Sequence, residues 1–310
     1  MTGHAISPYR PRAFDHCVLP VGELSVARAR LTALGFQVAA DAKHPFGTEN
    51  ACVYFDDGTF LEPMAIDQRE KCERTAQRGN VFTARDQAYR FRNGDNGFSA
   101  IALGTDNADA DHKGFRRQGI SAGRKLLFGR TMTDGSGAKA RATFKLAFAA
   151  DLRSPDSFLF TCQRVNTPAV DRAALQTHPN TVTGTAEIIA SEANPADFQY
   201  LLQDVINNRA TQAHSFGIEI AGADFTLNVM TPEGLRIHFG VERHVPTRGL
   251  RFEQGRQGRG GDRLRGGVPV QIDAAHGALT TGRAPPRRDR RARLPPAASA
   301  PARPRCGWRA

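Results

Sequence analysis

Two strand-like segments of the sequence each contain an ionisable side chain that is a candidate for catalysis or metal binding. Glu62 lies within the apolar run Phe60-Leu-Glu-Pro-Met64, and His16 lies within Phe14-Asp-His-Cys-Val-Leu19. A carboxylate buried in such a run is costly unless a cation, a hydrogen-bond donor or a raised pKa compensates for the lost water. Glu62 is therefore a candidate pocket residue that either meets a cation or acts as a general base toward an acidic C–H.

The alternation of side chains along a β-strand predicts which neighbours these two residues share. It places His16 on the same face as Phe14 and Val18, and Glu62 on the same face as Phe60. If the two strands are close in space, the imidazole and the carboxylate converge on one surface. The alternative for His16 is a half-buried strand histidine that hydrogen-bonds to a neighbour.

Three further residues are candidates for lining a small-molecule pocket. His44 and Asn50 bracket the polar loop His44-Pro-Phe-Gly-Thr-Glu-Asn50, which could form the pocket mouth or an ordinary turn. His238 lies far along the chain in an expected strand and is the third candidate. The 19 Phe residues outnumber 4 Tyr and 1 Trp, so those that face a cavity would favour an apolar or aromatic ligand.

The elements that must position these residues follow a repeated order. A strand over 14–21, a helix over 23–35 ended by Gly35 and three further strands up to residue 66 give a β-α-β-β-β unit, with Asp57-Gly58 as a hairpin turn. The same order recurs from residue 97 to residue 162, with Asp106 as the expected cap of its helix.

A third copy follows a polar linker. It is predicted to contain a strand over 183–189, a helix from Pro195 capped by Asn194, and strands over 217–220, 225–230 and 235–240. A fourth copy should begin close to Leu250.

Three motifs accompany this repeated unit: the Leu-x-x-Leu-Gly-Phe end of the first helix, the His44–Asn50 loop and Gly58-Thr-Phe-Leu-Glu62. Together with the repeated unit, they resemble the glyoxalase-like domain of the vicinal oxygen chelate superfamily. The likeness is closest over 14–190 and becomes a pattern match over 190–244. It implies an α+β fold in which tandem βαβββ units form half-open barrels of curved sheet. Residues 14–165 would form one domain of two units, and residues 178–244 a third unit in a partial second barrel.

The resemblance also implies a divalent metal, because ligands in this superfamily come from the first and last strands of each unit. His16 and Glu62 occupy those positions in the first unit and could hold Fe²⁺, Mn²⁺, Ni²⁺ or Zn²⁺. The second unit departs from the pattern, because Ala100 and either Phe160 or Thr161 stand there. In the third unit Ala186 aligns with His16, and His238 aligns with Glu62. Catalytic metals usually have three protein ligands, so the metal is expected only as one alternative.

Composition places the protein in a reducing, aqueous compartment. The five cysteines are odd in number and lack Cys-x-x-Cys spacing, which argues against a disulfide framework or a structural zinc site. The first 14 residues contain no apolar stretch of secretory type, and no segment has the roughly 18 apolar residues of a membrane span. We expect a cytoplasmic protein with no membrane partner.

The basic charge of the chain is confined to its end. Residues 245–310 contain 15 Arg, no Lys and 4 acidic residues, which accounts for the whole net charge of +11. This Arg-, Pro- and Gly-rich text predicts a disordered tail. Three explanations are open: out-of-frame translation of GC-rich DNA, which we favour, a native disordered tail, or an arm that binds nucleic acid. Residues 1–244 have no excess of positive charge, so nucleic acid is a disfavoured partner.

Two main hypotheses for function follow. The first is an enzyme of the isomerase, lyase or dioxygenase type, in which Glu62 moves a proton and a metal polarises vicinal oxygens. The second is a metal-free protein that binds and sequesters a small molecule. A missing fourth unit would expose sheet surface that a second copy of the chain could cover, so a homodimer is also expected.

Overall fold

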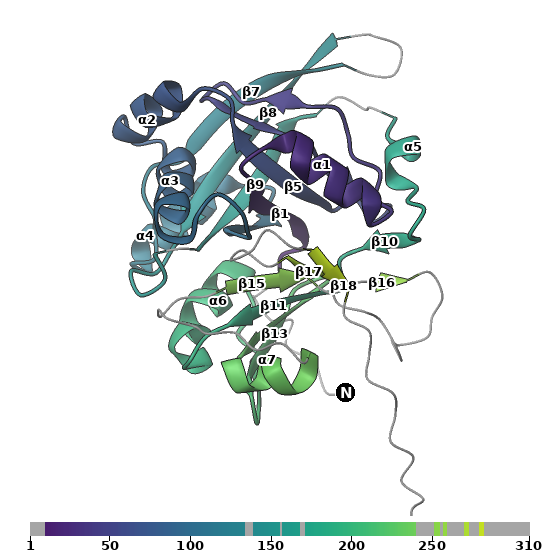
Figure 1. Cartoon of the computed structure of the whole chain (residues 1–310). Helices are drawn as coiled ribbons and strands as arrows, with labels where there is room; N and C mark the ends of the chain where they lie inside the picture. Colours follow the sequence, from purple (N-terminus) through teal and green to yellow (C-terminus); the bar gives the residue numbers. More distant parts are fainter. Residues whose placement is uncertain are drawn as a thin grey trace, which may run out of the picture.

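The architecture is a pair of curved sheets with helices packed on their faces (Figure 1). The computed structural model describes residues 10–133, 139–155, 157–167 and 171–239, and short strands at 251–254, 257–258, 270–272 and 279–281. Nine of the described strands form the first sheet and seven form the second. The helices in the described part of the chain are too short or too polar to span a bilayer.

The first βαβββ unit has the predicted order. Its elements are β1 (Phe14–Pro20), α1 (Leu24–Ala33), β2 (Ala42–Lys43), β3 (Thr48–Asn50), β4 (Val53–Tyr54) and β5 (Phe60–Ile66). Helix α1 packs Leu31 against Cys17 and Leu19 on the outer face of β1. The chain leaves this helix through Gly35, whose φ of 81° suits glycine and confirms the predicted helix stop.

Two helices that the sequence did not predict follow this unit: α2 (Arg69–Gln77) and α3 (Val81–Asn93). Their sequences are strongly polar, so their apolar periodicity is weak. Asn80 caps α3 by accepting hydrogen bonds from the backbone N–H groups of Phe82 and Thr83. Arg90 then ties α3 to the sheet, because its guanidinium donates to the carbonyl oxygen of Met64 at 2.8 Å.

The second unit also has the predicted order. Its elements are β6 (Ala100–Gly104), α4 (Ala108–Arg117), β7 (Leu126–Thr133), β8 (Lys139–Ala149) and β9 (Phe158–Asn166). The cap of α4 differs from the prediction by one residue. Asn107, rather than Asp106, accepts a hydrogen bond from the backbone N–H of Ala110.

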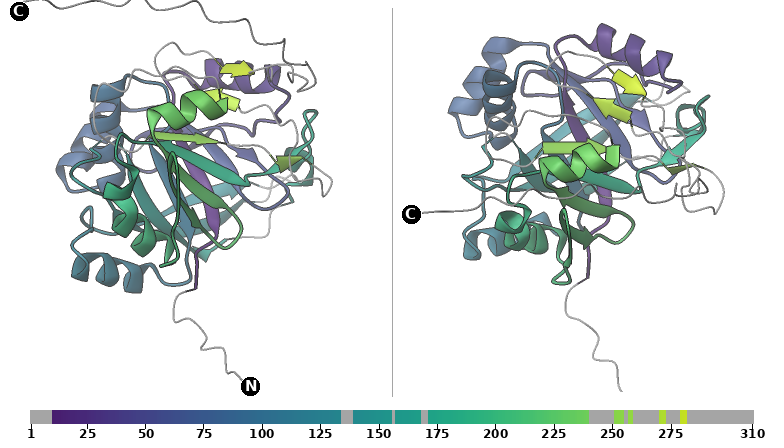
Figure 2. Two further views of the ribbon diagram at one scale, coloured as in Figure 1. Left: turned by 90° about the horizontal axis from the view of Figure 1, so that it is seen from below. Right: turned by 60° about the horizontal axis from the view of Figure 1, so that its bottom comes forward.

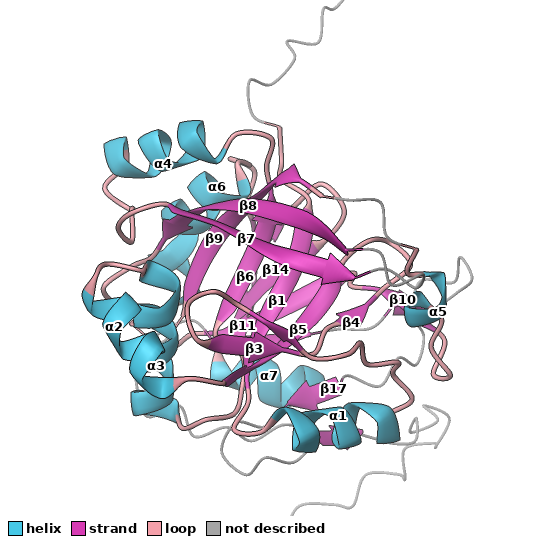
Figure 3. Cartoon of the chain, turned by 90° about the horizontal axis from the view of Figure 1, so that it is seen from above, coloured by secondary structure: helices cyan, strands magenta, loops and turns pink. Residues whose placement is uncertain are grey.

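The two units join edge to edge into one sheet with the order β2-β3-β5-β1-β6-β9-β8-β7, and β4 pairs with β5. At its centre β1 and β6 are antiparallel, while β5 lies parallel to β1 and β9 lies parallel to β6. The sheet curls so that β3 and β7 rise on opposite sides, with α2 and α3 beside one end (Figure 3). Its concave face carries a cluster of buried apolar side chains that includes Val18, Met64, Phe82 and Phe160.

The third unit begins the second sheet. It contains β11 (Glu187–Ser191), the 3₁₀ helix η1 (Pro195–Phe198), α6 (Gln199–Ile206), β12 (Gln212–His214), β13 (Gly217–Ala221) and β14 (Thr226–Met230). The linker before it holds α5 (Ala173–Gln176) and β10 (Val182–Gly184). The strand predicted over 183–189 is thus divided between β10 and β11.

The strand predicted over 235–240 is wrong, because residues Pro232–Phe239 form helix α7 (bright green in Figure 2). Thr231 starts this helix: its hydroxyl accepts from the backbone N–H of Gly234, and Pro232 occupies the first turn. Leu235 is then directed onto Met230 of the sheet.

Part of the predicted tail is described as short strands, namely β15 (Arg251–Gln254), β16 (Gln257–Gly258), β17 (Val270–Ile272) and β18 (Leu279–Thr281). Strand β15 pairs antiparallel with β11, as β6 does with β1. It therefore lies where the first strand of the predicted fourth copy belongs. The other residues of 245–310, on which the expectation of disorder mainly bears, lie outside the described part of the chain.

The two sheets share one core. Helix α6 packs Leu202 and Val205 into the same buried cluster as Cys17 and Ile101 of the first sheet. Arg12 reinforces this junction by donating to the carbonyl oxygen of Val205 at 2.6 Å. The third unit is therefore part of the packing that supports the first sheet.

Candidate functional site

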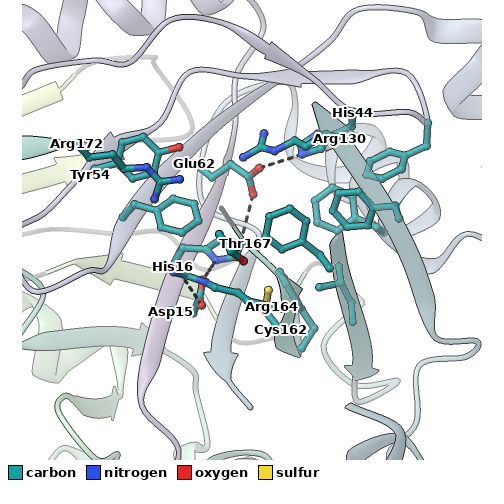
Figure 4. A pocket seen from close by; sticks show the side chains of 17 residues that line it. Asp15, His16, His44, Tyr54, Glu62, Arg130, Cys162, Arg164, Thr167 and Arg172 are labelled. Carbon is teal, nitrogen blue, oxygen red and sulfur yellow. Dashed lines mark hydrogen bonds and ion pairs between the residues drawn. The ribbon is translucent and has the colours of Figure 1, made fainter. Parts of the chain in front are cut away.

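A pocket of about 650 Å³, including the space at its mouth, opens on the concave face of the first sheet. Aromatic side chains form most of its wall, and polar side chains gather around Glu62 (Figure 4). Its polar lining includes Asp15, His16, His44, Tyr54, Glu62, Arg130, Arg164 and Arg172, and Phe60 and Phe160 are part of its aromatic wall. Both units contribute, so the pocket depends on their pairing.

His16 and Glu62 meet in this pocket, as the sequence predicted for strands that lie side by side. Strand β1 pairs in parallel with β5, which brings His16 Nε2 to 3.4 Å from Glu62 Oε2. The imidazole stacks on Phe60, with ring centroids 4.3 Å apart. Both side chains are less than a tenth exposed.

Asp15 is a site residue that alternation could not predict. A β-bulge in β1 places two residues, Phe14 and His16, opposite consecutive residues of β6, so Asp15 is the extra one. Asp15 and His16 consequently both line the pocket, and Asp15 Oδ1 lies 2.5 Å from His16 Nδ1. The bulge also corrects the predicted faces, because Phe14 packs into the outer core with Cys17 instead of sharing a face with His16.

Two carboxylates hold His16 in its charged form. Burial lowers the pKa of His16, but hydrogen bonds to Asp15 and Glu62 outweigh it and raise the pKa to about 9. For Glu62, burial raises the pKa, and the hydrogen bond and charge of His16 outweigh it, so the pKa falls to about 2. At neutral pH the two side chains form a buried ion pair.

His44 approaches the other side of the same carboxylate, with Nε2 at 3.5 Å from Glu62 Oε1. Its Nδ1 lies 2.9 Å from the Thr48 hydroxyl, and its ring stacks on Phe46. Burial is the main cause that lowers the pKa of His44 to about 4. One carboxylate therefore faces a charged and a neutral imidazole at pH 7.

Asn50 lies just beneath the pocket surface and orients the carboxylate of Glu62. Its amide donates to Glu62 Oε1 at 2.5 Å, and its carbonyl oxygen accepts from Arg130 Nη1 at 3.3 Å. The predicted loop residues His44 and Asn50 are thus both brought to Glu62. Arg130 belongs to β7, so the two hydrogen bonds of Asn50, one from Arg130 and one to Glu62, connect the second unit to the carboxylate of the first unit.

Three arginines of the pocket were not predicted from the sequence. Arg164 pairs with Asp15 at 3.0 Å, Arg130 lies over the ring of Phe144, and the Arg172 guanidinium lies 4.3 Å from the ring centroid of Tyr54. Nothing in the residues around them marks them out, because each reaches the pocket through pairing or docking of distant segments.

The second unit does not supply the ligands that a superfamily metal centre would need. Glu62 pairs in register with Val18, and the corresponding pair in the second unit is Phe160 with Ala102. Ala100 stands at the position of His16 and carries no ligating atom. Within the described ranges, no group of three or more His, Cys, Asp or Glu side chains is arranged to hold a metal ion. The donor set does not fit the implied metal centre.

His238 does not belong to this pocket. It is exposed on α7, where it packs against Phe216, so its alignment with Glu62 on a strand is wrong. The register of the third unit instead pairs Ile189 with Asn228, as Val18 pairs with Glu62. Asn228 donates to Glu187 at 3.3 Å, so a hydrogen bond joins the two positions that Glu62 and His16 occupy in the first unit.

Comparison with known proteins is consistent with this architecture. The model of a glyoxalase-like domain family matches residues 14–206. A hypothetical protein from Staphylococcus aureus has a TM-score of 0.56 at 12% identity, over 71% of this chain and 86% of that one.

Two other solved structures are less similar. A mutant of 4-hydroxymandelate synthase from Streptomyces coelicolor has a TM-score of 0.47 at 13% identity, over 73% of this chain and 64% of that one. Methylmalonyl-CoA epimerase from Mycobacterium tuberculosis has a TM-score of 0.34 at 14% identity, over 53% and 95% of the two chains. Among curated proteins, no sequence matches. Because the family model covers more than half of the chain and the paired βαβββ units are present, the chain belongs to the glyoxalase-like domain family of the vicinal oxygen chelate superfamily.

Proposed function

We propose that this protein binds a small organic molecule in the pocket and moves a proton on it by general acid–base catalysis. The observation that carries the proposal is the position of Glu62, whose carboxylate lies between the ring nitrogens of His16 and His44 on the wall of an aromatic cavity. The pKa of His16 is raised to about 9 and that of Glu62 is lowered to about 2, so at pH 7 the pair holds a proton donor beside a proton acceptor.

The roles follow from the charge states. Glu62 is ionised and accepts a proton from a carbon next to a carbonyl group, while His16, charged and oriented by Asp15, donates a hydrogen bond to the carbonyl oxygen as negative charge develops there. Return of the proton to a different carbon completes an isomerisation, and its return to the opposite face of the same carbon completes an epimerisation. No electrons are transferred, and no atoms are gained or lost.

The proposed mechanism uses no metal, because the side chains around Glu62 do not fit a metal centre. His16 and Glu62 are already engaged with each other and with Asp15 and Asn50. The chemistry is therefore assigned to side chains of this chain alone.

Binding without chemistry is the second candidate, and one observation favours it. A carboxylate with a pKa of about 2 is a weak base, so Glu62 depends on a bound ligand to weaken its contact with His16. A protein that only sequesters its ligand would need no such adjustment.

Proton exchange in D₂O tests the proposal. Wild-type protein is incubated with a panel of thioesters and 2-oxo acids, and loss of the C–H signal next to the carbonyl is followed by ¹H NMR. We expect exchange with at least one compound, and a roughly 100-fold or larger loss of rate in Glu62→Gln and His16→Gln. EDTA treatment should leave the rate unchanged.

Glu187→Gln is the matched control, because Glu187 is also a strand carboxylate bound to an asparagine but lies in the second sheet. It should exchange at the wild-type rate. Exchange that disappears with EDTA and returns with added metal would contradict the metal-free mechanism. Ligand binding without exchange of any compound would favour sequestration.

A further inference from the structure

The pocket combines an apolar wall with more positive than negative charge. Its apolar lining consists of Phe46, Phe60, Phe82, Phe128, Phe144, Leu146 and Phe160. Such a wall fits the hydrocarbon or aromatic body of a ligand, and a pocket of this size is typical of small-molecule sites.

The charges do not balance within the pocket. Its lining includes the carboxylates of Asp15 and Glu62 and the guanidinium groups of Arg130, Arg164 and Arg172. His16 pairs with both carboxylates, and Arg164 pairs with Asp15. In the described part of the chain, Arg130 and Arg172 have no carboxylate partner, so two guanidinium groups facing the cavity are left with uncompensated charge.

These two arginines are held in place by neutral groups. Arg130 extends from β7, lies over Phe144 with its guanidinium carbon 5.8 Å from the ring centroid, and contacts Asn50. Arg172 precedes α5, and its carbonyl oxygen accepts from the backbone N–H of Leu175. Figure 4 shows Glu62 between Arg172 on one side and Arg130 on the other.

The segment that carries Arg172 is itself fixed to the first unit. Gln176 Nε2 donates to the carbonyl oxygen of Phe55 at 2.7 Å. His178 Nε2 lies 2.8 Å from the carbonyl oxygen of Tyr54. Arg172 therefore stands over Tyr54 at a defined position beside the pocket.

From this geometry we propose that the ligand is a small organic carboxylate with an apolar body, and that Arg130 and Arg172 bind its charged group. A guanidinium fork matches a carboxylate in shape and charge, and the bond is stronger where the apolar wall excludes water. The inference rests on the proposed function only in placing the ligand in this pocket. It adds the substrate class and two specificity-determining residues.

Pairs of ligands that have similar shapes but different charges test whether the charge of the ligand determines its affinity. Calorimetry on the full chain would compare phenylacetate with phenylacetamide, and further aryl and alkyl carboxylates with their amides. We expect the carboxylate to bind at least about tenfold more tightly than its amide. Arg130→Gln and Arg172→Gln should each weaken carboxylate binding about tenfold and leave amide binding nearly unchanged.

Arg116→Gln serves as the control, because Arg116 lies on α4 outside this pocket. It should bind both ligands as the wild type does. Equal affinity for carboxylates and amides, no binding of any carboxylate in the panel, or unchanged carboxylate binding in both pocket variants would overturn the proposal. Glu62→Gln distinguishes this inference from the proposed function, since it should abolish proton exchange yet retain carboxylate binding.

Discussion

His44 shows at the scale of one residue how the site affects stability. Its pKa lies at about 4 in the folded protein and near 6.5 when the side chain is exposed. Below pH 6.5 the unfolded chain therefore binds a proton that the folded chain does not. The free energy of unfolding should fall as the pH drops from 6.5 to 4, by about 3 kcal/mol for this residue.

Urea unfolding of wild type and His44→Gln at pH 7 and pH 4.5 measures this contribution. The variant should lose less stability on acidification, because glutamine does not titrate. The carboxylates titrate in both proteins and cancel in the comparison. Equal acid sensitivity of the two proteins would show that His44 is not buried in its neutral form.

The site itself was only partly predictable from residue types. Glu62 stood out because a carboxylate in an apolar run needs a partner, and alternation brought His16 toward it. His44 and Asn50 were predicted as candidate pocket residues at the ends of a loop, but their contacts with Glu62 were not predicted. Asp15 depended on a bulge, and a bulge changes which residues share a face without changing the composition of the strand.

At the scale of elements, the loop before β3 holds His44 and is anchored to α2. Gly47 lies at its tip with a φ of 103°, and its carbonyl oxygen accepts from the backbone N–H groups of Asp67 and Gln68. A Cβ atom there would lie 2.8 Å from the carbonyl oxygen of Gln68. Gly47→Ala should destabilise the protein by about 2 kcal/mol and weaken ligand binding, because the loop must move.

Gly58→Ala is the comparison variant. Gly58 also has a positive φ, of 87°, but a Cβ atom there meets nothing within 4 Å. Its cost should be limited to backbone strain, about 1 kcal/mol, with ligand binding intact. Thermal unfolding and calorimetry of both variants check this, and an equal effect on binding would contradict the anchoring role of Gly47.

The helices show where local sequence patterns fail. Helix α1 was predictable because its apolar residues recur at helical spacing and Gly35 ends it. Helices α2 and α3 are too polar for such a pattern. Helix α2 packs against α3, and α3 is stabilised by the Asn80 cap and by the hydrogen bond from Arg90 to the carbonyl oxygen of Met64 in β5. Helix α7 resembled a strand because Leu235 and Phe239 occur in a short apolar run.

At the scale of the molecule, the third unit contributes to the core beneath the site. Leu202 of α6 is fully buried in the cluster that also contains Cys17 and Leu19 of β1. Leu202→Ala should therefore cost about 2–5 kcal/mol and lower the midpoint of one common unfolding transition. Far-UV circular dichroism and tyrosine fluorescence in urea would follow both sheets. Two separate transitions would contradict a shared core.

The repeated order of elements made the architecture predictable, since each βαβββ unit has its own hydrophobic pattern. The pairing of β1 with β6 and of β11 with β15 depends on contacts between distant residues. For that reason the equivalents of His16 and Glu62 in the third unit were misassigned to Ala186 and His238. The register places Glu187 and Asn228 there instead.

The proposed chemistry requires Glu62 to lie between one charged and one neutral buried imidazole. Histidine ¹⁵N NMR from pH 3 to pH 10, assigned with His16→Gln and His44→Gln, measures both protonation states directly. We expect His16 to stay protonated up to about pH 9 and His44 to stay neutral down to about pH 4. Glu62→Gln should lower the pKa of His16. Two histidines that both titrate near pH 6.5 and do not respond to Glu62→Gln would contradict this arrangement.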